Sequence, residues 1–378
     1  MKADFFDEDL ESFRELVAEY AKREVAPYYA QWTEDHNTPR EPWLAAGEQG
    51  ILGLAIPEQY GGIEITDYRY RIVIDQELLK VGAAATALGF HLNDDFVLPF
   101  LLDLGTEKQK QKWLPGMVSG EIIASHGFSE PEAGSNLSAI RTTASKDGNH
   151  YLVNGQKVFI GNGKNSDIVL ALTRTPKGPT LFIVERDMEG FSSGNTYPKM
   201  ALNASDTTPL VFKDVKVPQE NMLGEEGKAL EYAAQHYIRG RLAIATAANV
   251  ISEQALELTK QYVQERKQFG QQVSDFQNTR FVLASMQAKF NAARSLLEDC
   301  ILKHNELKLT SSEAAQVKLL CTETNSEVVD KCLQLFGGYG FIMEYPIAQL
   351  YTASRILPIF GGTNEIMKEI IAKDILDS

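Results

Sequence analysis

Three segments of the chain combine small residues with side chains that can donate hydrogen bonds or carry charge. The first is GFSEPEAGSNLSAIRTTA at 127–144, which places Ser129, Gly134 and Ser135 in a loop after an expected strand. Small residues let a backbone approach a ligand closely, and hydroxyl and backbone N–H groups can bind a flat heteroaromatic ring or a phosphate. This composition is equally typical of an ordinary polar turn, so the loop alone does not establish a site.

The second segment, ERKQFGQQVSDFQ at 265–277, brings a cation and an aromatic ring together. Arg266 can donate two hydrogen bonds to a pyrophosphate, and Phe269 can cover an apolar ring. The alternative is a helix C-terminus with favourable cations and a Gly270 cap. The third segment, LQLFGGYGF at 333–341, either ends an apolar helix or lets a cofactor lie on the backbone.

The hydrophobic pattern indicates the elements that must position these segments. Apolar residues at helical spacing predict helices near 42–52, 71–90, 107–118, 275–304 and 311–336. Short strand-like runs separated by turn residues predict a β region, with a hairpin at Asn154-Gly155. The order is a helical domain at 1–120, a small β domain at 121–225 and a helical bundle at 226–378, a mostly helical α+β fold.

Composition limits the classes of partner. Among 378 residues, acidic side chains exceed basic ones by 51 − 37 = 14, which argues against broad binding to nucleic acid or to anionic membranes. The first residues, MKADFFDEDLESF, lack the pattern of a secretory signal, and no apolar stretch approaches the length of a membrane span. The three cysteines, Cys300, Cys321 and Cys332, have neither disulfide parity nor metal spacing. We therefore expect a cytoplasmic protein without a metal site.

Taken in order, the motifs of this chain resemble those of the acyl-CoA dehydrogenase family of flavoproteins along nearly the whole length. They are IPEQYGG, FSEPEAGS, NGQKVFI, SDT with VFKDVKVP, ERKQFG, LFGGYGF and IFGGTNEI. The resemblance implies a barrel-like β domain between an N-terminal helical domain and a C-terminal four-helix bundle. It also implies FAD as cofactor, an acyl thioester on coenzyme A or a carrier protein as substrate, and electron-transfer flavoprotein or oxygen as electron acceptor. A homodimer or homotetramer is implied as well, because the family shares its FAD site between subunits.

The same resemblance assigns residues to the cofactor. Phe128 and Ser129 match the pair that hydrogen-bonds the edge of the flavin ring, and Phe159 and Gly161 match an aromatic residue and a threonine beside it. Gly161 is thus a departure that removes a hydroxyl group. The other implied FAD contacts are Gly134, Ser135, Arg266, Phe269, Gln277, Gln334, Gly338, Thr363 and Glu365. The implied substrate contacts are Ser135, Tyr237, Arg241, Phe360 and Gly361.

The catalytic base is where the sequence departs most from the family pattern. Family members take the substrate proton with a carboxylate at one of two positions, and both positions are glycine here, Gly361 and Gly240. Asp95 and Asp94, in HLNDDFVLP, and His126 are the candidates for a relocated base. For each of them the alternative is a structural or solvated side chain.

A reaction that needs no strong base is the other explanation. Where the carbon that loses hydride carries an alcohol or amine, the lone pair of the heteroatom drives the transfer and a weak base suffices. The wording of the first motif and the glycine at 161 resemble family members that act on hydroxyacyl or aminoacyl groups of carrier proteins, in biosynthesis. A flavin-dependent oxygenase or oxidase on the same fold, and a catalytically silent FAD-binding subunit, remain alternatives.

Overall fold

The computed structural model describes residues 5–377. In chain order it has an N-terminal helical domain, a middle β domain and a C-terminal helical domain, as predicted. By packing it forms two compact units: one consists of residues 18–66 and 85–237, and the other of 5–17, 67–84 and 238–377. Among the helices of these residues, none is both long and apolar enough to cross a membrane.

Within the described residues, seven α-helices precede the sheet. They are α1 (Glu8–Tyr20), α2 (Tyr29–Glu34), α3 (Glu41–Glu48), α4 (Arg69–Lys80), α5 (Ala84–Asp94), α6 (Leu98–Leu104) and α7 (Glu107–Ser119). The single helix predicted at 71–90 is two helices, because the chain turns at Gly82 with a φ of 79°, a conformation that favours glycine. The start of α7 is fixed by a capping box between Thr106 and Gln109.

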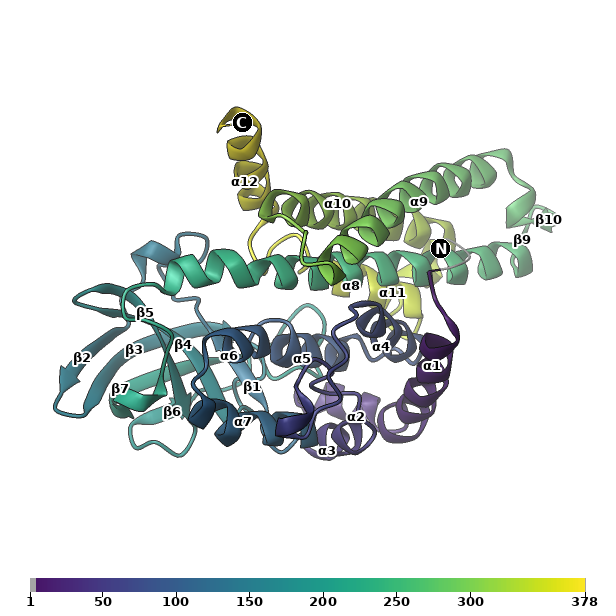
Figure 1. The fold of residues 1–378 in the computed structure, drawn as a ribbon. Coiled ribbons are helices and arrows are strands. Elements are labelled where there is room, and N and C mark those ends of the chain that lie inside the picture. The colour runs from purple at the N-terminus through teal and green to yellow at the C-terminus, as the bar shows by residue number, and fades with distance from the viewer. Residues whose placement is uncertain (1–4, 378) are drawn as a thin grey trace. The chain divides into compact units, whose positions relative to one another are not determined.

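The β domain is an eight-stranded mixed sheet (Figure 1). Its strands are β1 (Ala124–Gly127), β2 (Thr143–Asp147), β3 (His150–Ile160), β4 (Ile168–Thr175), β5 (Gly178–Glu185), β6 (Phe191–Ser193), β7 (Thr208–Pro218) and β8 (Met222–Leu223). The order is β6-β7-β3-β2-β4-β5-β8, and β1 pairs with β4 in parallel. Successive residues of β4 pack into two different apolar clusters, Leu170 with Trp113 of α7 and Val169 with Phe182. Both faces of β4 are therefore covered, which explains its continuous apolar run.

The prediction of a hairpin at Asn154-Gly155 is wrong. Strand β3 runs straight through these residues, and the register against β7 shifts between Val153 and Gly155 as in a β-bulge. Gly155 is required because a Cβ atom there would lie 2.4 Å from Thr142 Oγ1. The hairpin turn lies earlier, between β2 and β3, where Gly148 has a φ of 60°.

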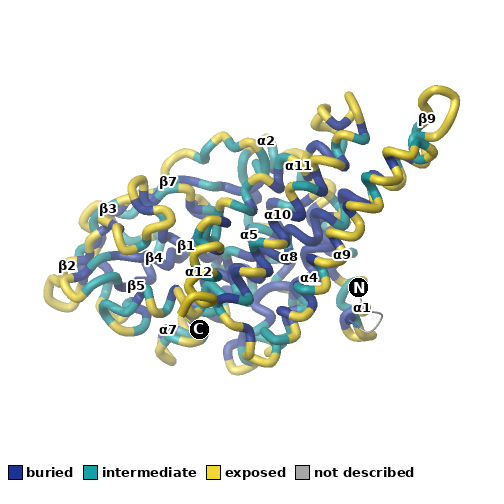
Figure 2. The backbone as a smooth tube through the Cα atoms, turned by 90° about the horizontal axis from the view of Figure 1, so that it is seen from above, coloured by how far each residue is buried: buried dark blue, intermediate teal, exposed yellow. Residues whose placement is uncertain are grey.

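The C-terminal domain consists of long helices (Figure 1). They are α8 (Ala229–Glu265), α9 (Gln277–Asn305), α10 (Ser311–Phe336), α11 (Pro346–Ser354) and α12 (Asn364–Asp377). The helices predicted at 275–304 and 311–336 are thereby confirmed as α9 and α10. Between α8 and α9 lies a small hairpin of β9 (Lys267–Gln268) and β10 (Gln271–Gln272), whose tip is exposed in Figure 2. α10 packs against α9, α11 and α12, and so forms the centre of this domain.

Candidate active site

The first glycine-rich segment folds as a tight loop directly after β1. Glu130 and Ala133 exchange backbone hydrogen bonds of 3.0 and 3.1 Å, and the carbonyl of Ser129 accepts a hydrogen bond of 2.9 Å from the backbone N–H of Val158. Phe128 is buried within the apolar cluster under the sheet. Loop and strand β3 are therefore held together at the residues predicted to contact the flavin.

Gly134 and Ser135 lie at the exposed tip of the same loop. A Cβ atom at Gly134 would have no heavy atom within 4 Å, so the backbone there is open to a ligand.

Phe159 lies near the end of β3 and Gly161 follows the strand directly. The backbone angle and exposure of Phe159 and the close neighbour of Gly161 are both unusual. Phe159 has a φ of 60° and leaves 70 % of its surface exposed, although an aromatic residue normally avoids both conditions. A Cβ atom at Gly161 would lie 2.4 Å from Cδ1 of Leu92. This atom is the far end of a flexible side chain, and the next atom of Leu92 would lie 3.8 Å away, so a small residue at 161 would require only that the leucine turn aside.

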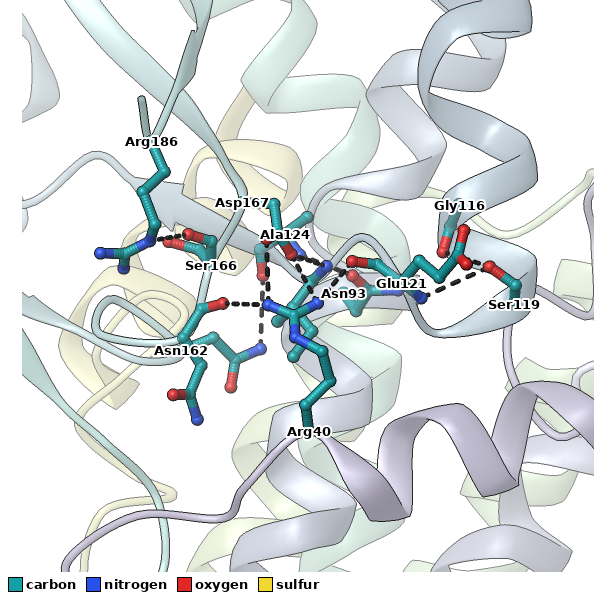
Figure 3. Close-up of polar contacts among 12 residues, drawn as sticks. Arg40, Asn93, Gly116, Ser119, Glu121, Ala124, Asn162, Ser166, Asp167 and Arg186 are labelled. Carbon is teal, nitrogen blue, oxygen red and sulfur yellow. Dashed lines mark hydrogen bonds and ion pairs between the residues drawn. The ribbon is translucent and has the colours of Figure 1, made fainter. Parts of the chain in front are cut away.

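A polar network fixes the start of β1 and the loop after Gly161 (Figure 3). Arg40 forms a bidentate ion pair with Asp167, with N–O distances of 2.9 and 3.0 Å. Asn93 of α5 accepts a hydrogen bond of 2.8 Å from the N–H of Ala124, while the amide of Asn162 donates to carbonyls of α5 and β1. These side chains tie α5, β1 and the 161–167 loop into one rigid group.

His126 lies on β1, where its ring stacks on that of Phe128 with 3.8 Å between centroids. Its Nε2 atom is 3.4 Å from the hydroxyl oxygen of Tyr237. Burial, and then the positive charge of Lys157, lower the pKa of His126 to about 3. The imidazole is therefore neutral at physiological pH, able to accept a hydrogen bond but a weak proton acceptor.

The two candidate aspartates are buried within α5 and the turn that follows it. Asp94 accepts hydrogen bonds from the N–H of Gly53 at 3.1 Å and from the amide of Asn93 at 2.9 Å. Asp95 lies 2.5 Å from Nδ1 of His91. Both carboxylates thus have structural partners, and a role for either of them as catalytic base stays a prediction.

The second and third segments meet in the C-terminal domain, where they line a cavity of about 820 Å³. Of the predicted cofactor residues, this cavity brings together Arg266, Phe269, Gln334 and Gly338, whereas Gln277 is not among its lining residues. Phe269 occupies the turn of the β9–β10 hairpin with a φ of 52° and is 95 % exposed.

The sequence analysis missed other lining residues, among them Tyr262 and Tyr339. The guanidinium of Arg266 lies 5.4 Å from the ring of Tyr339. Tyr262 lies on α8 about one helical turn before Arg266, and Tyr339 stands within the third segment beside Gly338, so both had a signal in the sequence.

The double glycine precedes α12. Gly361 and Gly362 have φ values of 60° and 91°, and the hydroxyl of Thr363 caps the helix by accepting from the N–H of Ile366. The fully buried Lys318 of α10 donates to the carbonyl of Gly362 at 2.8 Å and to the Asn364 side chain at 2.9 Å. Lys318, which the sequence analysis did not single out, therefore anchors this turn.

The other predicted residues of this domain lie on its helices or beside them. Arg241 donates to the hydroxyl of Ser311 at 2.8 Å, and Gly240 is buried in α8. Phe360 directly precedes the double glycine, and Glu365 lies in the first turn of α12.

FAD carries a flat ring system and a doubly charged pyrophosphate, and the residues present fit both. Phe159 and Phe269 are exposed rings held in backbone conformations that cost energy, and residues in such conformations cluster at functional sites. Arg266 supplies a cation on a cavity wall, and Gly338 leaves open backbone beside it. The β domain and the C-terminal domain thus each contain, taken separately, residues of the kind that such a cofactor requires.

Comparison with known proteins gives the same assignment. Three family models match in sequence, the N-terminal domain of acyl-CoA dehydrogenase at 7–121, its middle domain at 125–215 and its C-terminal domain at 228–376. The mitochondrial long-chain specific acyl-CoA dehydrogenase of Sus scrofa is 39 % identical over 378 residues, covering 98 % of this chain and 87 % of that protein. The crystal structure of an acyl-CoA dehydrogenase from Geobacillus kaustophilus superimposes with a TM-score of 0.96 at 40 % identity, covering 99 % and 100 % of the two chains. Glutaryl-CoA dehydrogenase of Mycobacterium smegmatis in complex with FADH2 gives a TM-score of 0.93 at 25 % identity over 100 % and 97 %. The chain therefore belongs to the acyl-CoA dehydrogenase family, whose members are FAD-binding oxidoreductases of acyl thioesters.

Proposed function

We propose that the protein is an FAD-dependent dehydrogenase that oxidises the Cα–Cβ bond of an acyl-coenzyme A thioester. The observation that carries this proposal is the pair of exposed aromatic rings, Phe159 and Phe269, held at positive φ in the segments that match the family's cofactor motifs. Supporting it, Arg266 and Gly338 line one cavity with Phe269.

The chain's residues hold the cofactor and the substrate in this proposal. Ser129 and the backbone of Phe128 bind the edge of the flavin ring, and Arg266 binds the pyrophosphate. Bound FAD supplies the acceptor for the hydride that leaves Cβ. A proton must leave Cα at the same time, and its acceptor in this chain is the open part of the mechanism, since Gly240 and Gly361 occupy the usual carboxylate positions.

Of the three candidate bases, His126 is the one that packs directly on Phe128. Its pKa of about 3 makes it a weak base, so proton removal from an ordinary acyl group would be slow. This observation favours a second candidate function, oxidation at a carbon that bears a hydroxyl or amino group. The proton then comes from oxygen or nitrogen, and water or a weak base suffices as its acceptor.

An anaerobic titration of the FAD-loaded protein tests both functions. The panel contains saturated acyl, 3-hydroxyacyl and aminoacyl groups, each on coenzyme A and on a carrier protein. Bleaching of the oxidised flavin absorbance by saturated acyl-coenzyme A supports the main proposal, whereas bleaching by hydroxyacyl or aminoacyl groups alone supports the second. No bleaching by any thioester overturns both. Oxygen consumption coupled to product formation would then identify an oxygenase, and retained FAD with neither reaction would identify a silent subunit.

The remaining assignments belong to the same proposal. We infer a homo-oligomer that shares its FAD between subunits, electron-transfer flavoprotein as the electron acceptor, and a cytoplasmic location.

A further inference from the structure

A buried ion pair lies beneath the loop that follows β1. Lys157 of β3 and Glu130 of the loop are 2.7 Å apart, and their side chains are 0 % and 5 % exposed. Placing two charges in a protein interior is costly, and an apolar pair of similar volume stabilises a core as well or better. Stability alone therefore does not account for this pair.

The contacts of the pair show what an apolar pair could not do. The ammonium of Lys157 also donates to the carbonyl of Leu172 at 2.6 Å and to that of Phe128 at 3.3 Å. The carboxylate of Glu130 accepts from the backbone N–H groups of Arg141 at 2.5 Å and Thr142 at 3.0 Å. One ion pair therefore fixes both ends of the 128–142 loop to strands β3 and β4.

We propose that Lys157 is a positioning residue for the flavin, which orients the Phe128 carbonyl and places the ammonium end of the Lys157–Glu130 ion pair behind the flavin-binding loop. The inference rests on the proposed function, in which Phe128 and Ser129 hold the edge of the flavin ring. A reduced flavin carries more negative charge than an oxidised one. A cation fixed in a low-dielectric interior therefore stabilises the reduced form and raises the reduction potential.

The charge of Lys157 depends on pH within a useful range. Burial lowers the pKa of Lys157 to about 8, against the opposing effect of the Glu130 carboxylate. The charge of Lys157 in turn lowers the pKa of His126 on β1, and this histidine is neutral above about pH 3. Above about pH 8 the ammonium loses its proton, and its effect on the flavin is lost with it.

Lys157→Met tests the proposal, because methionine keeps the length of the side chain and removes its charge and donors. Lys157→Arg keeps the charge and serves as the conservative variant. Lys177→Met is the matched control, since this lysine is exposed and pairs with Glu226 on another turn of the β domain. Each FAD-loaded protein is reduced in equilibrium with a dye of known potential. In Lys157→Met we expect the ratio of reduced to oxidised flavin to fall at least tenfold, about 30 mV for a two-electron couple.

A second readout needs no cofactor. In the FAD-free protein, hydrogen exchange at the amides of Arg141 and Thr142 should be faster in Glu130→Gln and in Lys157→Met than in wild type or in Lys177→Met. If Lys157→Met fails to fold, the flavin reduction potentials of wild type and Lys157→Arg are measured from pH 7 to 9.5. We expect an additional fall of the potential near pH 8 in the wild type and none in Lys157→Arg.

The outcomes separate the two proposals. An unchanged reduction ratio in folded, FAD-loaded Lys157→Met, or a wild-type potential with no additional fall near pH 8, overturns the role of Lys157. A wild-type protein that does not bind FAD overturns the proposed function instead.

Discussion

Lys318 gives the sharpest test of the energetics of the double-glycine turn. Its ammonium is fully buried and donates to the Gly362 carbonyl and to Asn364. Burial lowers the pKa of Lys318 to about 8, with a smaller opposing effect of Glu365 and a further lowering by Arg241. Lys318→Met removes the charge and both hydrogen bonds while keeping the length of the side chain.

Two contributions to the effect of Lys318→Met on the free energy of unfolding oppose each other at neutral pH. Leaving the two buried acceptors without a donor costs about 1–3 kcal/mol each. Removing the buried ammonium charge offsets this cost. The lowering of the Lys318 pKa from 10.5 to about 8 corresponds to a destabilisation of the charged form by about 3.4 kcal/mol, which the substitution removes. The net effect at pH 7 is therefore within about 3 kcal/mol of zero, and the dependence on pH is the more decisive quantity.

The sign of that dependence follows from proton binding. Above pH 8 the folded protein releases the proton of Lys318, whereas the unfolded chain keeps it until about pH 10.5. The unfolded state binds more protons in this window, so the wild type gains stability relative to Lys318→Met as pH rises. Between pH 7 and 10 the gain is about 2.5 kcal/mol.

Thermal unfolding of wild type and Lys318→Met at pH 7, 8, 9 and 10 measures this gain. We expect the Tm difference to move in favour of the wild type by about 3 °C, since an unfolding entropy of about 2.1 cal/mol/K per residue gives about 1.3 °C per kcal/mol for a chain of 378 residues. Lys368→Met, which alters an exposed lysine paired with Glu323, is the control and should follow the wild type in parallel. The buried Lys157 contributes to every protein in the series and cancels. A constant difference, or one that moves against the wild type, would refute the reasoning.

Two further substitutions test the site and the sheet. Gly361→Glu places a carboxylate at a position where family members carry the catalytic base. The φ of 60° at this position costs a side chain about 1–2 kcal/mol, so Tm should fall. Anaerobic bleaching of the flavin by saturated acyl-coenzyme A should nevertheless be about 100-fold faster than in Gly361→Gln. Equal bleaching rates in the two variants would show that a base at this position is not what limits the reaction. Gly155→Ala brings a Cβ atom 2.4 Å from Thr142 Oγ1 and should cost about 1–3 kcal/mol beyond Gly148→Ala, where no heavy atom lies within 4 Å. Equal Tm values for the two alanine variants would contradict the bulge interpretation.

Much of the fold was predictable because its signals are local. The long apolar stripes of α9 and α10 predicted both helices to within two residues, and the double glycine after Phe336 predicted the end of α10. The error at Asn154-Gly155 has the opposite cause. The same dipeptide suits a tight turn or a bulge, and the choice depends on Thr142, which the sequence does not show to be adjacent.

The candidate site was predictable in part, for the same reason. Residues in recognisable motifs, such as Arg266 and Gly338, do line one cavity. The buried lysines were missed because a lysine is ordinarily read as exposed. Lys157 is in phase with the buried Tyr151 and Val153, but the shift of register after Val153 and the exposed Phe159 interrupt the alternation of β3, so the pattern did not show on which side Lys157 lies.

The way the double-glycine turn is anchored bears on how the family can change its chemistry. Lys318 binds the carbonyl of Gly362 and the side chain of Asn364, and neither contact involves the side chain at position 361. The anchor is thus indifferent to which residue stands there. The side chain at 361 is therefore the part of this turn that can change without the loss of either hydrogen bond.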